Sequence, residues 1–334
     1  MSSHPADTIS VVMPCYNGAE YIRQALDSAL AQTHRPVQII VVDDGSKDES
    51  AAIVRDYQAR YPDRGIELIQ QPNGGEPVAR NTGIRASLGE WVAQLDTDDW
   101  WEPTKLATQL EAARAAGPQC VMVHTAVVGH LPDGRLNKPD PVPDSTRVGW
   151  CTAALLEAKS IGHPSIMVRR GALATIGGYD PAFKQACDID LYLRLSVVGT
   201  FAYVRQYLLH YRYHAKQMSA SPVHQIRYHH RAFRKFFDEH SDAAAKIGRD
   251  VLDQKLAEHV AVKLQSLWWR RNLPAFRELL AYAQQEKLNN ADIQSWRAKA
   301  RFPDWIIHCK DWFDRMRGKS TSPRGSAIDL PGAA

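Results

Sequence analysis

The sequence predicts an α/β protein with a mostly parallel sheet, followed by an all-helical C-terminal region. Up to about residue 200, short apolar runs alternate with amphipathic segments of roughly ten to fifteen residues, which is the pattern of βαβ units. Beyond His224 the apolar residues recur at helical spacing, as in Leu252, Leu256 and Val260. We therefore expect an α/β domain over residues 1–222, a helical region over 223–319 that packs its apolar stripe on the first domain, and a disordered tail over 320–334.

The individual elements follow from periodicity and from turn residues between them. Residues 131–148 are rich in Pro, Asp and Gly, and we expect a long surface loop positioned to cover a site. The expected strands are 9–13, 38–42, 66–69, 91–95, 121–124 and 166–168. The expected helices are 22–30, 53–57, one that carries residues 80–83, 105–115, 189–197, 252–268 and 276–283.

Composition excludes several classes of function. A net charge of +4 over 334 residues does not indicate nucleic-acid binding, which usually shows a concentrated basic face. The five cysteines are scattered without a CxxC pair, so we expect neither a zinc site nor disulfides, and a cytoplasmic location. Residues 1–8 lack the apolar core of a signal peptide, and no run approaches the ~20 apolar residues of a membrane span. Any membrane contact should therefore be peripheral, at the inner face.

Three carboxylates, Asp96, Asp98 and Asp99, follow the apolar run 91–95. Carboxylates crowded at the end of a buried strand repel one another and lose solvation, so they need a compensating cation. A hard divalent ion, Mg²⁺ or Mn²⁺, takes oxygen ligands and is usually completed by substrate phosphates. The alternative is a polar turn in which one Asp caps the following helix. Three carboxylates within four residues favour the cation.

Polar residues also follow two other predicted strands: Pro14, Tyr16 and Asn17 after the first, and Asp43 and Asp44 after the second. In a parallel sheet, ligands bind at the carboxyl ends of the strands, near a switch in strand order. We therefore expect one site of nucleotide size. Neither GxGxxG nor GxxxxGK[ST] follows the first strand, which weighs against a dinucleotide enzyme or an ATP kinase.

Three later features leave alternatives open. Asp188 lies at the start of the predicted helix 189–197, where a carboxylate is stabilised by the helix dipole. It can be a helix cap or a functional residue, and the pattern alone does not decide between the two. His214 follows an aromatic and basic run, and a single His is more often structural than a ligand. Residues 302–319 place aromatic side chains beside Lys and Arg, which fits a membrane-surface helix but equally fits core packing.

Five motifs occur in order over roughly the first 220 residues. They are Ser10-Val-Val-Met-Pro-Cys-Tyr-Asn17, Val41-Val-Asp-Asp-Gly-Ser46, Ala79-Arg-Asn-Thr-Gly83, Leu95-Asp-Thr-Asp-Asp-Trp100, and Gly177-Gly-Tyr-Asp180 followed by Asp188. Taken together, these motifs resemble the signature of glycosyltransferase family 2. The resemblance implies a GT-A fold and an inverting transfer of a sugar from a nucleotide-diphosphate donor.

The resemblance also implies which residues bind the donor. We expect Asp98, Asp99 and His214 at the metal, and the nucleotide to contact Pro14, Tyr16, Asn17, Asp43, Asp44, Arg80, Asn81, Asp96 and Asp98. Tyr16 would stack on the base, and Asp44 would accept the imide N–H of uracil or thymine. Asp98 would contact the ribose or the metal, and Asp99 the metal that bridges the diphosphate, although family members differ in which Asp of this turn ligates. His214, in Tyr-Arg-x-His, matches a position near the diphosphate or metal.

Three further positions complete the match. Asp188 falls on the family's general base, while Arg80 and Asn81 fall on a motif at the nucleotide side. Many relatives have Glu-Asp where this chain has Cys187-Asp188, a departure that weakens inference of the acceptor by analogy.

The expected function is therefore a metal-dependent hexosyltransferase that uses a UDP- or dTDP-sugar and a glycan or lipid-linked acceptor, in cell-surface polysaccharide synthesis. Two alternatives stay open. One is a sugar nucleotidyltransferase, which usually begins with a glycine-rich basic loop that this N-terminus lacks. The other is a non-catalytic nucleotide-sugar-binding module, against which the complete set of aspartates argues.

Overall fold

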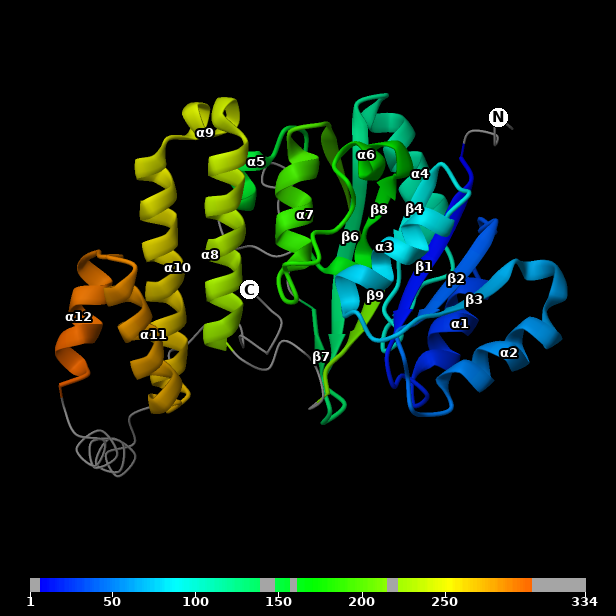
Figure 1. The fold of residues 1–334 in the computed structure, drawn as a ribbon, viewed down its shortest axis with the longest axis horizontal. Coiled ribbons are helices and arrows are strands. Elements are labelled where there is room, and N and C mark those ends of the chain that lie inside the picture. The colour runs from blue at the N-terminus through cyan, green and yellow to red at the C-terminus, as the bar shows by residue number, and fades with distance from the viewer. Residues whose placement is uncertain (1–6, 139–147, 157–160, 215–221, 302–334) are drawn as a thin grey trace. The chain divides into compact units, whose positions relative to one another are not determined.

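The computed structural model describes residues 7–138, 148–156, 161–214 and 222–301 (Figure 1). The chain divides into two compact units, the first formed by residues 1–155 and 160–215 and the second by 156–159 and 216–334. The functional boundary expected at residue 222 stays a prediction. The expected tail 320–334 and the segment 302–319 lie outside the described residues, as does the stretch 139–147 of the expected loop 131–148.

The first unit contains a nine-stranded sheet with the order β3-β2-β1-β4-β8-β6-β9-β5, and β7 pairs with β6. The pairs β1–β2, β2–β3, β1–β4 and β6–β9 are parallel, whereas β8 is antiparallel to both β4 and β6, and β5 is antiparallel to β9. The strands are β1 (Ile9–Cys15), β2 (Gln38–Asp43), β3 (Ile66–Gln70), β4 (Trp91–Gln94), β5 (Trp100–Trp101), β6 (Cys120–His130), β7 (Leu136–Asn137), β8 (Met167–Arg169) and β9 (Thr200–Arg212).

Helices cover both faces of this sheet because the central strands are apolar on both sides (Figure 1). Alternate β1 residues, such as Val11 and Met13, join a core with α1, α2 and α4. Val12 faces α3, which lies so close that any side chain at Gly83 would collide with it. The helices are α1 (Ile22–Leu30), α2 (Ser50–Arg60), α3 (Glu76–Ala86), α4 (Lys105–Ala116), α5 (Thr152–Leu155), α6 (Arg170–Thr175) and α7 (Cys187–Ser196).

The mostly parallel α/β class is confirmed, but sequence reasoning missed the strands β5 and β9, and also β7, which lies in the expected loop 131–148 and pairs with β6. In β9 the alternation of buried and exposed residues breaks at Arg205 and Gln206, which are both exposed. The pairing with β6 shifts register at the same place, between Thr125 and Ala126. Such an irregularity hides the period of two by which a strand is recognised.

The second unit is helical, as expected. Its main apolar contacts join α10 to α11 and α12, with the rings of Trp268, Phe276 and Trp296 in mutual contact. The expected packing of the stripe on the first domain stays a prediction. The helices are α8 (Pro222–Glu239), α9 (Ser241–Ile247), α10 (Arg249–Trp269), α11 (Leu273–Gln285) and α12 (Ala291–Lys299). Across the described residues, every helix is too short or too polar to span a membrane.

Candidate active site

The carboxyl ends of β1, β2 and β4 meet at one edge of the sheet, because the three strands are parallel neighbours. Backbone contacts join the first two ends: the Asp44 N–H donates to the Cys15 carbonyl at 2.8 Å. Asn17 is tied to the same turn, since its Oδ1 accepts from the Lys47 N–H at 2.8 Å. Tyr16 remains 56% exposed at this edge, so one face of its ring is available for stacking.

The two carboxylates at the end of β2 brace the loops around them. Asp43 accepts the Ser46 N–H and the Gln70 amide, each at 3.0 Å. Asp44 accepts the Gln71 side-chain amide at 2.7 Å and the N–H groups of Gly74 and Gly75, at 2.9 and 2.8 Å. Both carboxylates are buried, so these donors supply the compensation that burial requires.

A fully buried cation, Arg80, lies beneath the aspartates. Its guanidinium donates to Glu76 at 2.5 and 2.9 Å, to Gln94 at 2.9 Å and to Asp96 at 2.6 Å. Burial raises the pKa of Asp96 to about 6, although Arg80 opposes that shift. Arg80 thus compensates Asp96 and Glu76 from below, and its donors are occupied inside the protein.

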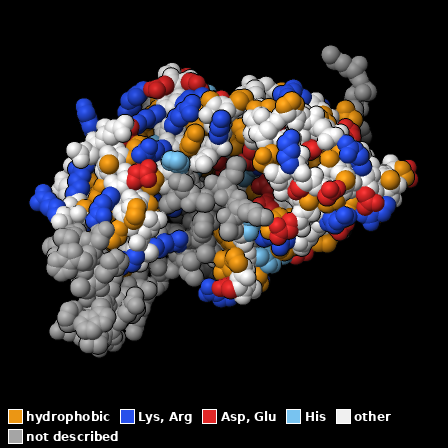
Figure 2. Space-filling view, turned by 60° about the horizontal axis from the view of Figure 1, so that its bottom comes forward, with side chains coloured by type: hydrophobic (Ala, Val, Ile, Leu, Met, Phe, Trp, Pro, Cys, Tyr) orange, Lys and Arg blue, Asp and Glu red, His pale blue; other side chains and the backbone are white. Residues whose placement is uncertain are grey.

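Asp96, Asp98 and Asp99 each offer an oxygen within 4.8 Å of the other two. Asp99 is 1% exposed, and its Oδ1 accepts the Arg212 N–H at 2.9 Å, while its Oδ2 is buried without a hydrogen-bond partner among the described residues. Burial and then the charges of Asp98 and Asp96 raise the pKa of Asp99 well above its ordinary value. Asp and Glu side chains are visible inside a hollow in the space-filling view of Figure 2.

The end of β9 completes this cluster, because β5 pairs with β9 immediately after the aspartates. His214 Nε2 lies 2.9 Å from Asp98 Oδ2, and the His214 ring packs on Tyr21 at a centroid distance of 5.2 Å. The Arg212 side chain donates to the Asp98 carbonyl at 3.1 Å. The structure therefore places His214 against the Asp98 carboxylate.

The alternative that an aspartate of this turn caps the next helix is not what the structure shows. Helix α4 begins at Lys105 after Thr104, whose side chain makes no capping hydrogen bond, and in the first turn the Leu106 N–H donates to Gln32 Oε1 at 3.0 Å instead of to an aspartate. The three carboxylates thus lie close to one another and interact with Arg80 and with the residues at and just after the end of β9.

Asp188 is the second residue of α7, and the residue before the helix is Ala186 in a left-handed conformation with φ 53°. Asp188 is therefore not the cap residue. Its side chain is half-buried, and burial raises its pKa to about 6. The charge of Glu76 contributes to the raised pKa of both Asp188 and Asp96, so Glu76 lies near both carboxylates.

Asn81 does not point into open space but holds the turn that precedes α7. Its amide donates to the Tyr179 carbonyl at 2.7 Å and accepts the Tyr179 N–H at 2.8 Å. Gly178 has φ +73°, and a Cβ there would lie 2.5 Å from Asn81 Oδ1, so the close approach requires glycine. This clamp connects α3 to the segment that leads to Asp188.

Sequence reasoning missed Glu76, and it missed a series of buried hydrogen bonds that involves Tyr192 of α7, the helix that carries Asp188. The two ring nitrogens of His163 lie 2.7 Å from the Tyr192 hydroxyl and 2.8 Å from the Tyr179 hydroxyl. Burial lowers the pKa of His163 well below its ordinary value, so a neutral imidazole joins the two phenols. Tyr179 sits within a quoted motif, but nothing in the sequence indicated its partner.

Comparison with known proteins identifies the family of this chain. Residues 10–142 match the model of glycosyl transferase family 2. A protein of Rickettsia prowazekii named as an uncharacterised glycosyltransferase is 31% identical over 227 residues, which cover 65% of this chain and 68% of that protein. Chondroitin synthase of Escherichia coli is 29% identical over 202 residues, which cover 59% of this chain and 28% of that protein.

Solved structures show the same fold at lower identity. S. aureus TarS 1-349, solved in complex with UDP-GlcNAc, has a TM-score of 0.62 and 18% identity, and the match covers 93% of this chain and 92% of that chain. A mannosyltransferase from Pyrobaculum calidifontis, in complex with GDP-Man and Mn²⁺, has a TM-score of 0.57 and 17% identity, with 95% and 90% covered. The GT-A fold that the motifs implied is thus confirmed, and the chain belongs to glycosyltransferase family 2.

Proposed function

We propose that residues 1–222 catalyse inverting transfer of a hexose from a UDP- or dTDP-sugar to a hydroxyl of a glycan or lipid-linked acceptor, in cell-surface polysaccharide synthesis. The observation that supports this most is the buried Asp99 Oδ2, which has no hydrogen-bond partner among the described residues and belongs to the aspartate cluster at the edge where β1, β2 and β4 end. Charge without compensation at a ligand-binding edge is typical of a site that is completed by its substrate.

The nucleotide would lie on the turns after β1 and β2. Tyr16 presents an exposed ring that can stack on a base. A carboxylate has about four acceptor positions, and Asp44 uses three of them on the loop 71–75. The position that remains on Asp44 Oδ2 suits a single N–H donor such as the imide of uracil or thymine.

The residues present fit a divalent cation, Mn²⁺ or Mg²⁺. The ligand atoms are hard carboxylate oxygens, the three groups are close enough to share one ion, and one buried oxygen has no hydrogen-bond partner in the part of the chain that the structure describes. Asp98 and Asp99 would hold the ion, with His214 orienting Asp98, while Asp96 is already neutralised by Arg80. When bound, the cation would supply positive charge against the departing diphosphate.

Asp188 would act as the general base. An acceptor hydroxyl is a poor nucleophile, so its proton must pass to a positioned carboxylate as the new bond forms. A pKa of about 6 leaves Asp188 mostly ionised at neutral pH, yet more basic than an ordinary carboxylate. The hydrogen bonds of Asn81 to Tyr179, and those of His163 to Tyr179 and Tyr192, would hold α7 and Asp188 in place.

The solved neighbours support the donor class, since one was crystallised with UDP-GlcNAc and the other with GDP-Man and Mn²⁺. They differ in the base, so the choice of a pyrimidine here depends on Tyr16 and Asp44 alone.

Calorimetry with UDP, dTDP, GDP and ADP, each with Mn²⁺ and with EDTA, tests the donor site. We expect binding of UDP or dTDP that disappears with EDTA. Preference for a purine nucleotide would contradict the role of Tyr16 and Asp44, and unchanged binding in EDTA would contradict the cation.

Asp188→Asn tests the base. It should keep donor binding while turnover falls by about a hundredfold or more, because only proton transfer is lost. Asp63→Asn, an exposed carboxylate of the same unit, is the matched control and should leave turnover unchanged. Near-normal turnover in Asp188→Asn would refute the assignment.

A further inference from the structure

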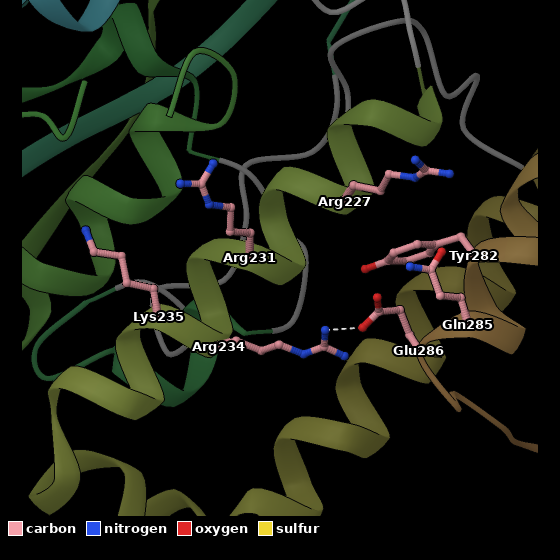
Figure 3. Close-up of a pocket in the computed structure, with 7 residues that line it drawn as sticks. All are labelled: Arg227, Arg231, Arg234, Lys235, Tyr282, Gln285 and Glu286. Atoms are coloured by element: carbon pink, nitrogen blue, oxygen red, sulfur yellow. Dashed lines mark hydrogen bonds and ion pairs between the residues drawn. The ribbon is translucent and has the colours of Figure 1, made fainter. Parts of the chain in front are cut away.

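A basic cavity lies in the second unit, between α8 and α11, and the catalytic site makes no use of it (Figure 3). Its volume is about 440 Å³, enough for a small anionic group with its hydration. The lining includes four basic side chains of α8 together with an aromatic ring and a carboxylate of α11: Arg227, Arg231, Arg234, Lys235, Tyr282 and Glu286.

The four basic residues all come from α8 and lie within a few turns of one another along it. Arg231 is four residues from both Arg227 and Lys235 and three from Arg234. Residues at these spacings are neighbours on a helix surface, and like charges there repel. Carboxylates lower this repulsion: Lys235 lies 3.9 Å from Glu239 of its own helix, and Arg227 and Arg234 face carboxylates of α11.

The carboxylates that α11 provides offset the cluster only weakly. Arg234 pairs with Glu286, and Arg227 lies 3.4 Å from Glu278. Both arginine side chains are about 40% exposed, at 39% and 42%, so water and salt screen these pairs. An incoming anion with a higher charge density can therefore compete for both guanidinium groups.

The geometry favours an oxyanion over a simple monovalent ion. Figure 3 shows Arg227 and Arg234 extending from α8 toward α11, on either side of Tyr282 and Glu286, while Arg231 and Lys235 extend from the other flank of α8. The Arg227 guanidinium lies 5.3 Å from the centre of the Tyr282 ring, and the Tyr282 hydroxyl lies 2.9 Å from His230 Nδ1. The planar fork of a guanidinium matches the paired oxygens of a phosphate group, and Arg227 is positioned over the Tyr282 ring.

We propose that this cavity binds a phosphate group through Arg227 and Arg234, as a site separate from the catalytic one. The phosphate belongs either to a soluble phosphate compound or to the headgroup of an anionic lipid. Both sources present the same oxygens to the guanidinium groups of Arg227 and Arg234.

The test measures binding of the full chain in EDTA, so that no cation-dependent phosphate site contributes. One arm titrates inorganic phosphate in a calorimeter, and the other sediments the protein with vesicles of phosphatidylcholine, with or without phosphatidic acid. The variant is Arg227→Gln with Arg234→Gln. The control is Lys246→Gln with Arg249→Gln, which removes the same charge from the same unit and also breaks an exposed ion pair, Arg249–Asp238.

We expect the variant to weaken phosphate binding by about tenfold or more, since two charge-assisted forks are lost, while the control keeps it. Loss of binding to the phosphatidic acid vesicles in the same variant would identify a lipid headgroup, and phosphate binding without vesicle binding would identify a soluble compound. Replacing both arginines with Lys keeps the charge and should restore only part of the affinity. Equal weakening in variant and control, or no loss in either arm, would overturn the proposal.

Discussion

Replacing Arg80 with Met should destabilise the first unit by about 3–5 kcal/mol at pH 8, because breaking a buried ion pair leaves its partners uncompensated. Arg80 is fully buried, and its guanidinium makes four hydrogen bonds to Glu76, Gln94 and Asp96. Met fills a similar volume, so packing is retained while every one of these bonds is lost. The carboxylate of Asp96 would then carry its charge beside Asp98 with no cation beneath it.

The loss should depend on pH in a known direction. The pKa of Asp96 is about 6 even with Arg80 in place, because burial outweighs the attraction of the guanidinium. Without Arg80 that pKa must rise further above the ordinary 3.9 of an unfolded Asp. A carboxyl group whose pKa is raised by folding destabilises the folded state most at pH values above that raised pKa. The destabilisation disappears as the pH falls toward the pKa of the group in the unfolded chain. The Met variant should therefore recover much of its stability near pH 5.

Urea denaturation at pH 8 and pH 5, with amide hydrogen exchange on peptides from α3 and β4, assigns the loss to the first unit. Arg85→Met removes an exposed arginine of the same helix and is the matched control, expected within about 0.5 kcal/mol of the parent chain. A loss below about 1 kcal/mol, or one that is equal at the two pH values, would refute the view that Arg80 compensates Asp96.

Three further predictions concern single residues. The kcat/KM of the parent chain should fall about tenfold per pH unit below about pH 6, as Asp188 gains its proton, and a flat acid limb would contradict the base assignment. Asp99→Asn should abolish Mn²⁺-dependent nucleotide binding in calorimetry, and unchanged binding would exclude Asp99 as a ligand. Burial lowers the pKa of Lys105 well below its ordinary value, so the amine holds its proton more weakly in the folded chain than in the unfolded chain. The free energy of unfolding should therefore rise between pH 7 and 9. In Lys105→Met the free energy of unfolding, measured by urea denaturation, should rise less steeply with pH, by up to about 1.4 kcal/mol per pH unit. The same pH dependence in variant and parent chain would show that Lys105 is charged in the folded protein.

The parts of the site that the sequence predicts well are those that follow directly from strand ends. Parallel neighbouring strands must bring their carboxyl ends to one edge, so an apolar run that stops in polar residues places those residues by itself. Tyr16, Asp44 and the aspartates after β4 are all of this kind. The helical pattern after residue 223 is equally local, because it depends only on the spacing of apolar residues.

The parts that could not be predicted depend on contacts between distant segments. Glu76 reads as an ordinary carboxylate in the first turn of α3, and only the fold shows that it shares Arg80 with Asp96. Asn81 lies 98 residues from the backbone that it holds at Tyr179. Nothing in the local pattern of either residue distinguishes a positioning role from direct contact with a nucleotide.

The same contacts divide the three aspartates in a way that the sequence leaves open. Asp96 has an internal cation, Asp98 has His214, and Asp99 has one backbone donor and one oxygen with no described partner. A cation that enters the cluster gains most from Asp99, whose charge is least compensated, and least from Asp96. The differences in compensation thus support the proposed ligation by Asp98 and Asp99 with Asp96 as their support, and Asp96→Asn should weaken Mn²⁺-dependent binding far less than Asp99→Asn in the same titration.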